Sequence, residues 1–70
     1  MLRMVEVYFS SNIQAIGFDH GVLRVVFHSG STYDYDDVPE EVFQQFLAAS
    51  SKGKYFAANV RGHYNARKVS

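Results

Sequence analysis

The chain has 70 residues, no cysteine and a formal net charge of zero. This length allows one domain at most, and the lack of cysteine excludes disulfides and thiolate metal sites. A hydrophobic content of 47% is typical of a folded protein and argues against intrinsic disorder. No stretch is long and apolar enough for a signal peptide or a membrane span. We therefore expect residues 1–70 to form a single cytoplasmic domain with no membrane partner.

The first half of the chain has the alternation of antiparallel strands. The expected strands are residues 4–9, 13–18, 22–28 and 31–36. Gly17 predicts a bulge or the close approach of another backbone within the second strand. Gly21, which tolerates a positive φ, predicts a three-residue hairpin loop after that strand.

The second half changes to helical spacing. Pro39, Glu40 and Glu41 are typical of a first helical turn, and Ser51 is a candidate cap for a second, shorter helix that Gly62 ends. The predicted fold class is α+β, a three- or four-stranded antiparallel meander followed by one helix and a second shorter helix packed on one face. The expected core residues are Leu23, Val25, Phe27, Val42, Phe43, Phe46, Leu47, Phe56 and Val60.

The sequence predicts no catalytic residues, metal site or cofactor. Ser51 and Lys54 spell S-x-x-K, but the companion motifs of serine hydrolases are absent and so small a domain cannot enclose such a site. The acidic residues between 34 and 40 lack the glycine and downstream glutamate of a calcium loop. The three histidines are scattered and have no ligand spacing.

Charge is distributed unevenly along the chain. Six of the seven acidic residues lie between Asp19 and Glu41, and only basic charges follow. A basic terminal segment attracts nucleic acid or another anion, or it is simply a solvated tail. Within it, the stretch 51–56 reads SKGKYF and places two lysines at a helix amino end, which suits either a phosphate or an ordinary capped helix.

Tyr33 and Tyr35 share one face of a predicted strand, and Asp34 and Asp36 share the other. Since carboxylates avoid burial, the tyrosine face is the expected inner face. Two interpretations stay open. The rings pack under a helix with their hydroxyls at solvent, or they remain partly exposed and stack on bases, as strand aromatics do in RNA-binding sheets.

Several stretches together resemble the KTSC domain, a small domain named after the carboxyl terminus of some lysyl-tRNA synthetases that also occurs as a free-standing bacterial or phage protein. These are SSNIQAIGFD, VVFHSGSTYDYDDVPEEVFQQFL with its Y-x-Y motif at Tyr33–Tyr35, and SKGKYFAANVRGHY. The resemblance covers about residues 10–65. It implies a free-standing KTSC protein and suggests RNA binding, because of the synthetase association, but no established activity.

The leading functional expectation is a small non-catalytic module that binds RNA or tRNA through the basic segment and neighbouring tyrosines. The candidate nucleic-acid-binding residues are Tyr33, Tyr35, Lys52, Lys54, Tyr55, Arg61, Tyr64, Arg67 and Lys68. The alternative is a protein-interaction or homo-oligomerisation module, in which the apolar amino-terminal strand pairs edges with a second copy to form a homodimer. Enzyme activity is not expected, because no nucleophile–base or acid–base pair emerges.

Overall fold

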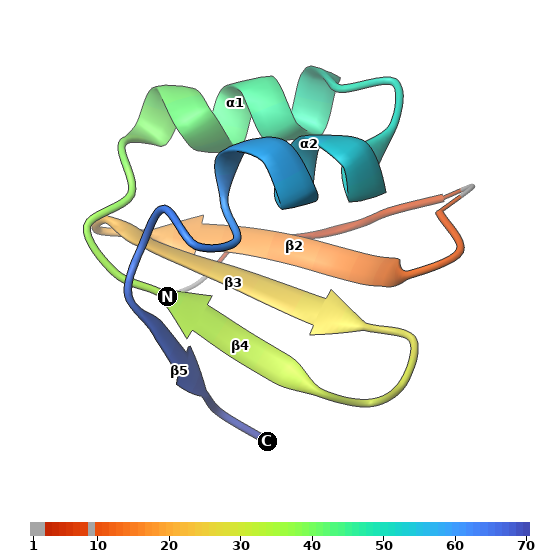
Figure 1. Cartoon of the computed structure of the whole chain (residues 1–70), viewed down its shortest axis with the longest axis horizontal. Helices are drawn as coiled ribbons and strands as arrows, with labels where there is room; N and C mark the ends of the chain where they lie inside the picture. The colour runs from red at the N-terminus through yellow and green to blue at the C-terminus, as the bar shows by residue number, and fades with distance from the viewer. Residues whose placement is uncertain (1–2, 9) are drawn as a thin grey trace.

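The computed structural model describes residues 3–8 and 10–70. Its elements in chain order are β1 (Arg3–Glu6), β2 (Ile13–Asp19), β3 (Val22–Phe27), β4 (Thr32–Tyr35), α1 (Glu40–Ala48), α2 (Lys52–Asn59) and β5 (Ala66–Lys68). The strands form one antiparallel sheet in the order β1-β2-β3-β4-β5, and both helices lie on the same face of it (Figure 1). The predicted α+β class, with a meander followed by two helices on one face, is confirmed. Phe9, at the end of the first predicted strand, lies outside the described residues.

The fifth strand, β5, is an addition to the three or four strands that the sequence predicts. It lies within the segment expected to be a basic tail and runs antiparallel to β4. Backbone bonds on both sides of β5 fasten it to the sheet. Asp36 N–H donates to the Asn65 carbonyl over 3.0 Å, and Val69 N–H donates to the Thr32 carbonyl over 2.7 Å. A three-residue strand with two cations and no apolar alternation leaves no period-two signal in the sequence.

The first hairpin is tighter than the sequence indicates. Asp19 pairs with Val22, so the loop has two residues, His20 and Gly21, instead of the expected three. Their φ angles of 47° and 82° are both positive, as a type I′ turn requires. The close approach expected at Gly17 is confirmed, because a Cβ there would collide with Met4 Sδ and lie 3.0 Å from the Arg3 carbonyl oxygen.

The core lies between the sheet and the helices. Of the nine predicted core residues, Phe27, Val42 and Leu47 are half-buried at its border and the other six are buried. Phe46 has no exposed surface, and its ring stacks on Tyr55 at a centroid distance of 5.3 Å. The core also takes in residues that the sequence analysis did not select: Val7, Ile13, Ile16, Tyr35 and Val38.

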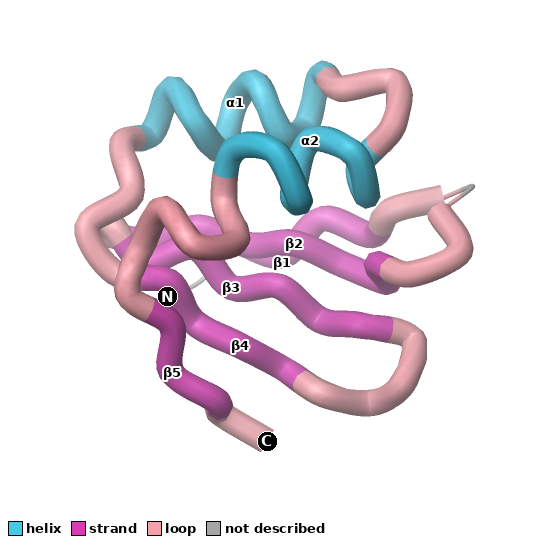
Figure 2. The backbone as a smooth tube through the Cα atoms, in the orientation of Figure 1, coloured by secondary structure: helices cyan, strands magenta, loops and turns pink. Residues whose placement is uncertain are grey.

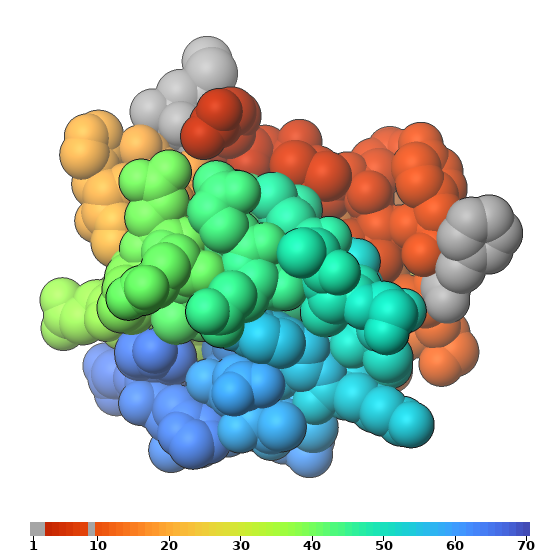
Figure 3. Space-filling view, turned by 90° about the horizontal axis from the view of Figure 1, so that it is seen from above, coloured from red at the N-terminus to blue at the C-terminus, as the bar shows by residue number. Residues whose placement is uncertain are grey.

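The molecule therefore has two layers, a helical layer and a sheet, with the opposite face of the sheet bare of helices (Figure 2). Seen from the helix side, α2 and the segment after it border the surface on one side of α1, and the amino-terminal region borders it on the other (Figure 3). No helix within the described residues is long and apolar enough to cross a membrane.

Candidate functional site

Strand β4 separates two kinds of side chain onto the two faces of the sheet. Tyr35 pairs with Leu23 and Tyr33 pairs with Val25, and these partners are buried under the helices. Asp34 pairs with Arg24 in the row between them, so its side chain points to the bare face. The expectation that the tyrosines occupy the inner face is therefore confirmed.

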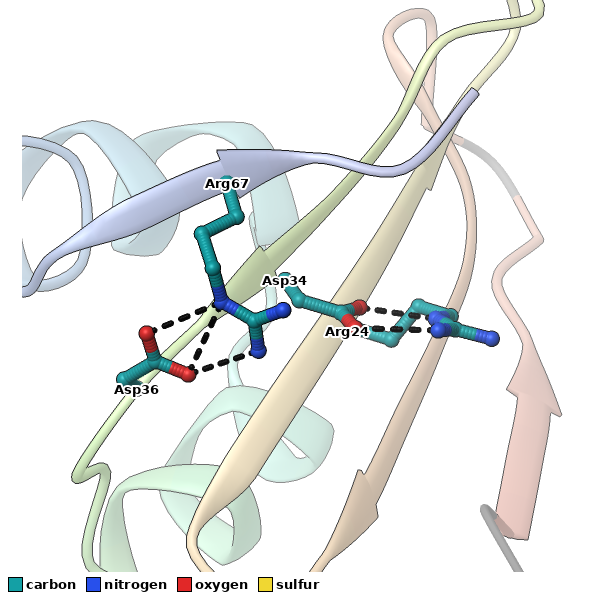
Figure 4. Close-up of polar contacts among 4 residues, drawn as sticks. All are labelled: Arg24, Asp34, Asp36 and Arg67. Atoms are coloured by element: carbon teal, nitrogen blue, oxygen red, sulfur yellow. Dashed lines mark hydrogen bonds and ion pairs between the residues drawn. The ribbon is translucent and has the colours of Figure 1, made fainter.

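The bare face carries two arginine–carboxylate pairs (Figure 4). Arg24 donates to Asp34 through Nε over 2.7 Å and through Nη2 over 2.9 Å, a two-pronged arrangement that leaves Asp34 only 5% exposed. Arg67, on β5, donates to Asp36 over 2.7 Å and holds the pKa of that carboxyl below its ordinary value by these hydrogen bonds. The guanidinium of Arg67, a candidate phosphate contact, is thus engaged on the face away from the tyrosines.

On the helix face, the two tyrosines line a pocket of about 350 Å³. Phe27, Phe56, Asn12, Arg61, Gly62 and Ala66 complete its lining. The aromatic rings of the pocket pack edge to face in two pairs. Their centroids are 6.1 Å apart for Phe27 and Tyr33 and 5.7 Å apart for Tyr35 and Phe56. The rings thus pack against the core and also line an open pocket, and their stacking on bases stays a prediction.

Tyr33 and Tyr35, which line this pocket, each carry a hydroxyl group. Neither hydroxyl has a hydrogen-bond partner among the described residues, although Tyr35 is 95% buried. No enclosed side-chain nitrogen or oxygen of those residues lacks a partner, so the unpaired Tyr35 oxygen keeps some contact with solvent. Burial raises the pKa of Tyr35, the electrostatic interaction with Tyr33 adds to this rise, and Arg61 opposes it. Tyr35 is therefore a neutral phenol at physiological pH, able to donate and to accept.

Two cations border the aromatic pocket on the side of the carboxyl terminus. Arg61 lies in the turn after α2, next to the capping residue Val60, and lines the pocket. Lys68 is the register partner of Tyr33 across the β4–β5 pair, so both side chains emerge from the same face of the sheet. The lining includes no acidic residue to neutralise either charge.

A second pocket, of about 360 Å³, opens where the amino end of α2 faces the segment before β2. Its lining is polar and consists of Ser10, Ser11, Asn12, Ser50, Ser51, Lys52, Gly53 and Lys54. Ser51 caps α2 as expected, since its Oγ accepts from Lys54 N–H over 3.3 Å. The Lys52 ammonium donates to the Ala49 carbonyl over 2.5 Å, whereas the Lys54 ammonium has no partner among the described residues. Asn12 belongs to both pockets and stands between them.

The remaining candidate tyrosines lie elsewhere. Tyr55 joins the two helices, because its ring stacks on Phe46 and its hydroxyl donates to the Val42 carbonyl over 3.3 Å and to Gln45 Oε1 over 3.1 Å. Tyr64 is half-buried against the core. The structure therefore brings Tyr33, Tyr35, Arg61 and Lys68 together, sets Lys52 and Lys54 at the neighbouring pocket, and gives Tyr55 and Arg67 structural contacts.

Asn12 is the one polar lining residue of the aromatic pocket that sequence reasoning did not select. The only signal for it is its place in the S-S-N-I stretch, which reads as a strand break. Its contribution depends on the bend that brings residues 10–12 beside α2, and no local pattern encodes that contact. Among the described histidine, aspartate and glutamate side chains, no group of three is placed to hold a metal ion.

Comparison with known proteins supplies the family. The KTSC domain family model matches residues 9–64. A protein of Tsukamurella paurometabola is 41% identical over 59 residues, which cover 81% of this chain and 88% of the relative. A protein of Stutzerimonas stutzeri is 43% identical over 49 residues, covering 67% of this chain and 69% of the relative.

A solved structure agrees over the whole length. The crystal structure of a KTSC domain protein from Yersinia pestis superposes with a TM-score of 0.92 at 36% sequence identity, and each chain is covered completely. The match spans every residue of this chain, and so includes those of the five-stranded sheet and both helices. The family-model match and this superposition together establish that the chain belongs to the KTSC domain family.

Proposed function

We propose that this protein is a non-catalytic module that binds single-stranded RNA, including the unpaired regions of a tRNA. The observation that carries the proposal is the aromatic pocket, in which Tyr33 and Tyr35 stand beside Arg61 and opposite Lys68. RNA is read mainly through unpaired bases that stack on aromatic side chains, with cations along the backbone. The chain has no net charge, but positive charge is concentrated beside the aromatic pocket. This arrangement is consistent with rings that stack on bases and cations that contact phosphates.

In this proposal one base enters the pocket and stacks on Tyr33, the less buried of the two rings. Arg61 and Lys68 contact the adjoining phosphates from the carboxyl-terminal side. A strand that continues past Asn12 reaches the second pocket, where Lys54 supplies a further cation. Tyr55, Tyr64 and Arg67 act through the fold and not through RNA, because their side chains are engaged elsewhere.

The test is fluorescence anisotropy of a labelled single-stranded RNA, titrated at several salt concentrations. Binding should weaken steeply with salt, because each phosphate contact on a single strand adds about 0.7 to the slope of log affinity against log salt. Arg61→Gln should lower the magnitude of that slope by about 0.7, the value for one phosphate contact. Tyr33→Leu should weaken binding by about 5-fold to 150-fold, the equivalent of one lost stacking interaction.

The matched control is Arg67→Gln, which removes the same charge from the opposite face of the sheet. It should leave the affinity and the salt slope nearly unchanged. Absence of binding at low salt would refute the proposal outright. Equal losses for Arg61→Gln and Arg67→Gln would mean that only overall charge matters, and would remove the aromatic pocket from the site.

A second candidate function is self-association through β1. This strand is at the edge of the sheet, all four of its residues are exposed, and Met4 and Val5 are 43% and 39% exposed. An exposed edge strand offers unpaired backbone groups to a second copy of the chain. Sedimentation equilibrium should then give a dimer that Val5→Lys dissociates, and a monomer at high concentration would refute this candidate.

A further inference from the structure

We propose that the aromatic pocket takes an unpaired adenine and that Asn12 determines this choice. The inference rests on the proposed RNA binding and names the base that the same site prefers. It starts from the polar groups that the pocket offers, which are the Asn12 amide, the two tyrosine hydroxyls and the Arg61 guanidinium. A planar ligand with a hydrogen-bonding edge and an attached anion fits this set, and a nucleotide has both features.

The Asn12 side chain is free to read a ligand while its backbone is held in place. The Asn12 carbonyl accepts from His28 N–H over 2.9 Å, and Asn12 N–H donates to Ser10 Oγ over 3.4 Å. The side-chain amide has no hydrogen-bond partner among the described residues, and the residue is exposed. An anchored backbone with an unpaired amide at the pocket mouth presents one donor and one acceptor to whatever enters.

The complement of an amide is a base edge with an adjacent donor and acceptor. Adenine offers N6–H and N7 for the paired contact that asparagine and glutamine make with this base. The corresponding edge of guanine carries two acceptors, which suit an arginine better than an amide. Cytosine and uracil also have an adjacent donor and acceptor, but their single rings give Tyr33 less area for stacking.

The second observation is the unpaired hydroxyl of Tyr35. Tyr35 is 95% buried and lines the same pocket as Asn12, and its hydroxyl has no hydrogen-bond partner among the described residues. A neutral phenol accepts from an exocyclic amino group or donates to a ring nitrogen, so it adds a further polar contact for a base held against Tyr33. The pocket thus combines ring stacking with groups that distinguish one base from another.

The experiment compares a labelled oligouridine with the same oligomer carrying a central adenine, guanine or cytosine, by anisotropy at constant salt. The adenine oligomer should bind about tenfold more tightly than oligouridine, the discrimination expected of one paired amide contact. Asn12→Ala should lose the preference for adenine, so that the adenine oligomer and oligouridine bind the variant with similar affinity. Asn59→Ala, which removes an exposed amide from α2 outside both pockets, should keep the preference.

The outcomes separate this inference from the function on which it rests. Equal affinity for all four oligomers, a preference for guanine or cytosine, or an adenine preference that survives Asn12→Ala would each overturn the role of Asn12 while leaving RNA binding intact. Failure of every oligomer to bind would refute RNA binding itself. Because the Asn12 side chain is exposed and unbonded, its truncation should leave the thermal unfolding curve in place, which circular dichroism checks.

Discussion

Replacing Phe46 by alanine removes an aromatic ring of α1 from the core between the helices and the sheet. The ring has no exposed surface and stacks on Tyr55 at 5.3 Å and on Phe56 at 6.4 Å. Because Tyr55 also bonds the backbone of α1 through its hydroxyl, the loss affects the contact between the helices as well as the core. We expect Phe46→Ala to reduce the free energy of unfolding by more than any single surface change.

The magnitude follows from burial and chain length. Truncating a buried phenylalanine to alanine costs about 3–5 kcal/mol, which includes the cavity left behind. A chain of 70 residues has a total stability of about 3.5–10 kcal/mol at the usual value per residue. The alanine variant therefore loses at least about a third of the total stability. Phe46→Leu, which keeps most of the apolar volume, should lose about 1–2 kcal/mol and remain measurable.

Urea unfolding followed by circular dichroism is the assay, with the slope of free energy against urea checked for constancy between variants. Tyr8→Ala is the matched control for loss of an aromatic ring, because Tyr8 is 72% exposed, and it should change stability by less than about 0.5 kcal/mol. A loss below about 1 kcal/mol for Phe46→Ala at constant slope would refute this placement of α1 against the sheet.

Three further predictions concern polar contacts. Arg24→Ala and Asp34→Ala should each destabilise the fold, and a double-mutant cycle in urea should give a coupling of about 1–3 kcal/mol for this largely buried pair, with zero coupling as the contrary result. The lowered pKa of Asp36 contributes stability that is present above 3.8, its ordinary value, and lost as the pH falls through the lowered value. Arg67→Gln should reduce this loss of stability at acid pH. An unchanged loss would contradict the pairing of Arg67 with Asp36. Ser51→Ala should cost about 1 kcal/mol in the same assay through loss of the α2 cap, and no loss would show that the cap is dispensable.

The sequence predicts the helices and strands that have a periodic pattern of apolar residues. It does not predict a strand that is held in the sheet by backbone pairing alone. The stripe of α1 and the alternation of β3 identify Phe43, Phe46 and Val25 as core residues, and all three are buried. Ile16 is fully buried but is not among the predicted core residues, because the sequence of its strand shows no clear contrast between the two faces. Strand β5 is held by pairing to β4 and so has no signal of its own.

The candidate site shows the same division between local pattern and tertiary contact. Alternation along β4 was enough to place Tyr33 and Tyr35 on the inner face. The pocket they line also needs Arg61 from the turn after α2 and Asn12 from the segment before β2, which lie far apart in the sequence. Only the packed fold brings these side chains together. The sequence therefore predicts the correct face of β4 for the two tyrosines but does not predict the pocket.

The motif around β4 has a further physical consequence for charge. Alternation sends Tyr33 and Tyr35 to one face, whereas Asp34 and Asp36 neutralise Arg24 and Arg67 on the other. With these carboxylates held on the bare face, Arg61 and Lys68 keep their charge on the helix face beside the aromatic pocket. A chain with no net charge thus presents a cationic aromatic surface on one side. Asp34 and Asp36 therefore do not oppose an anion on the helix face, because both carboxylates lie on the other face and are paired with arginines.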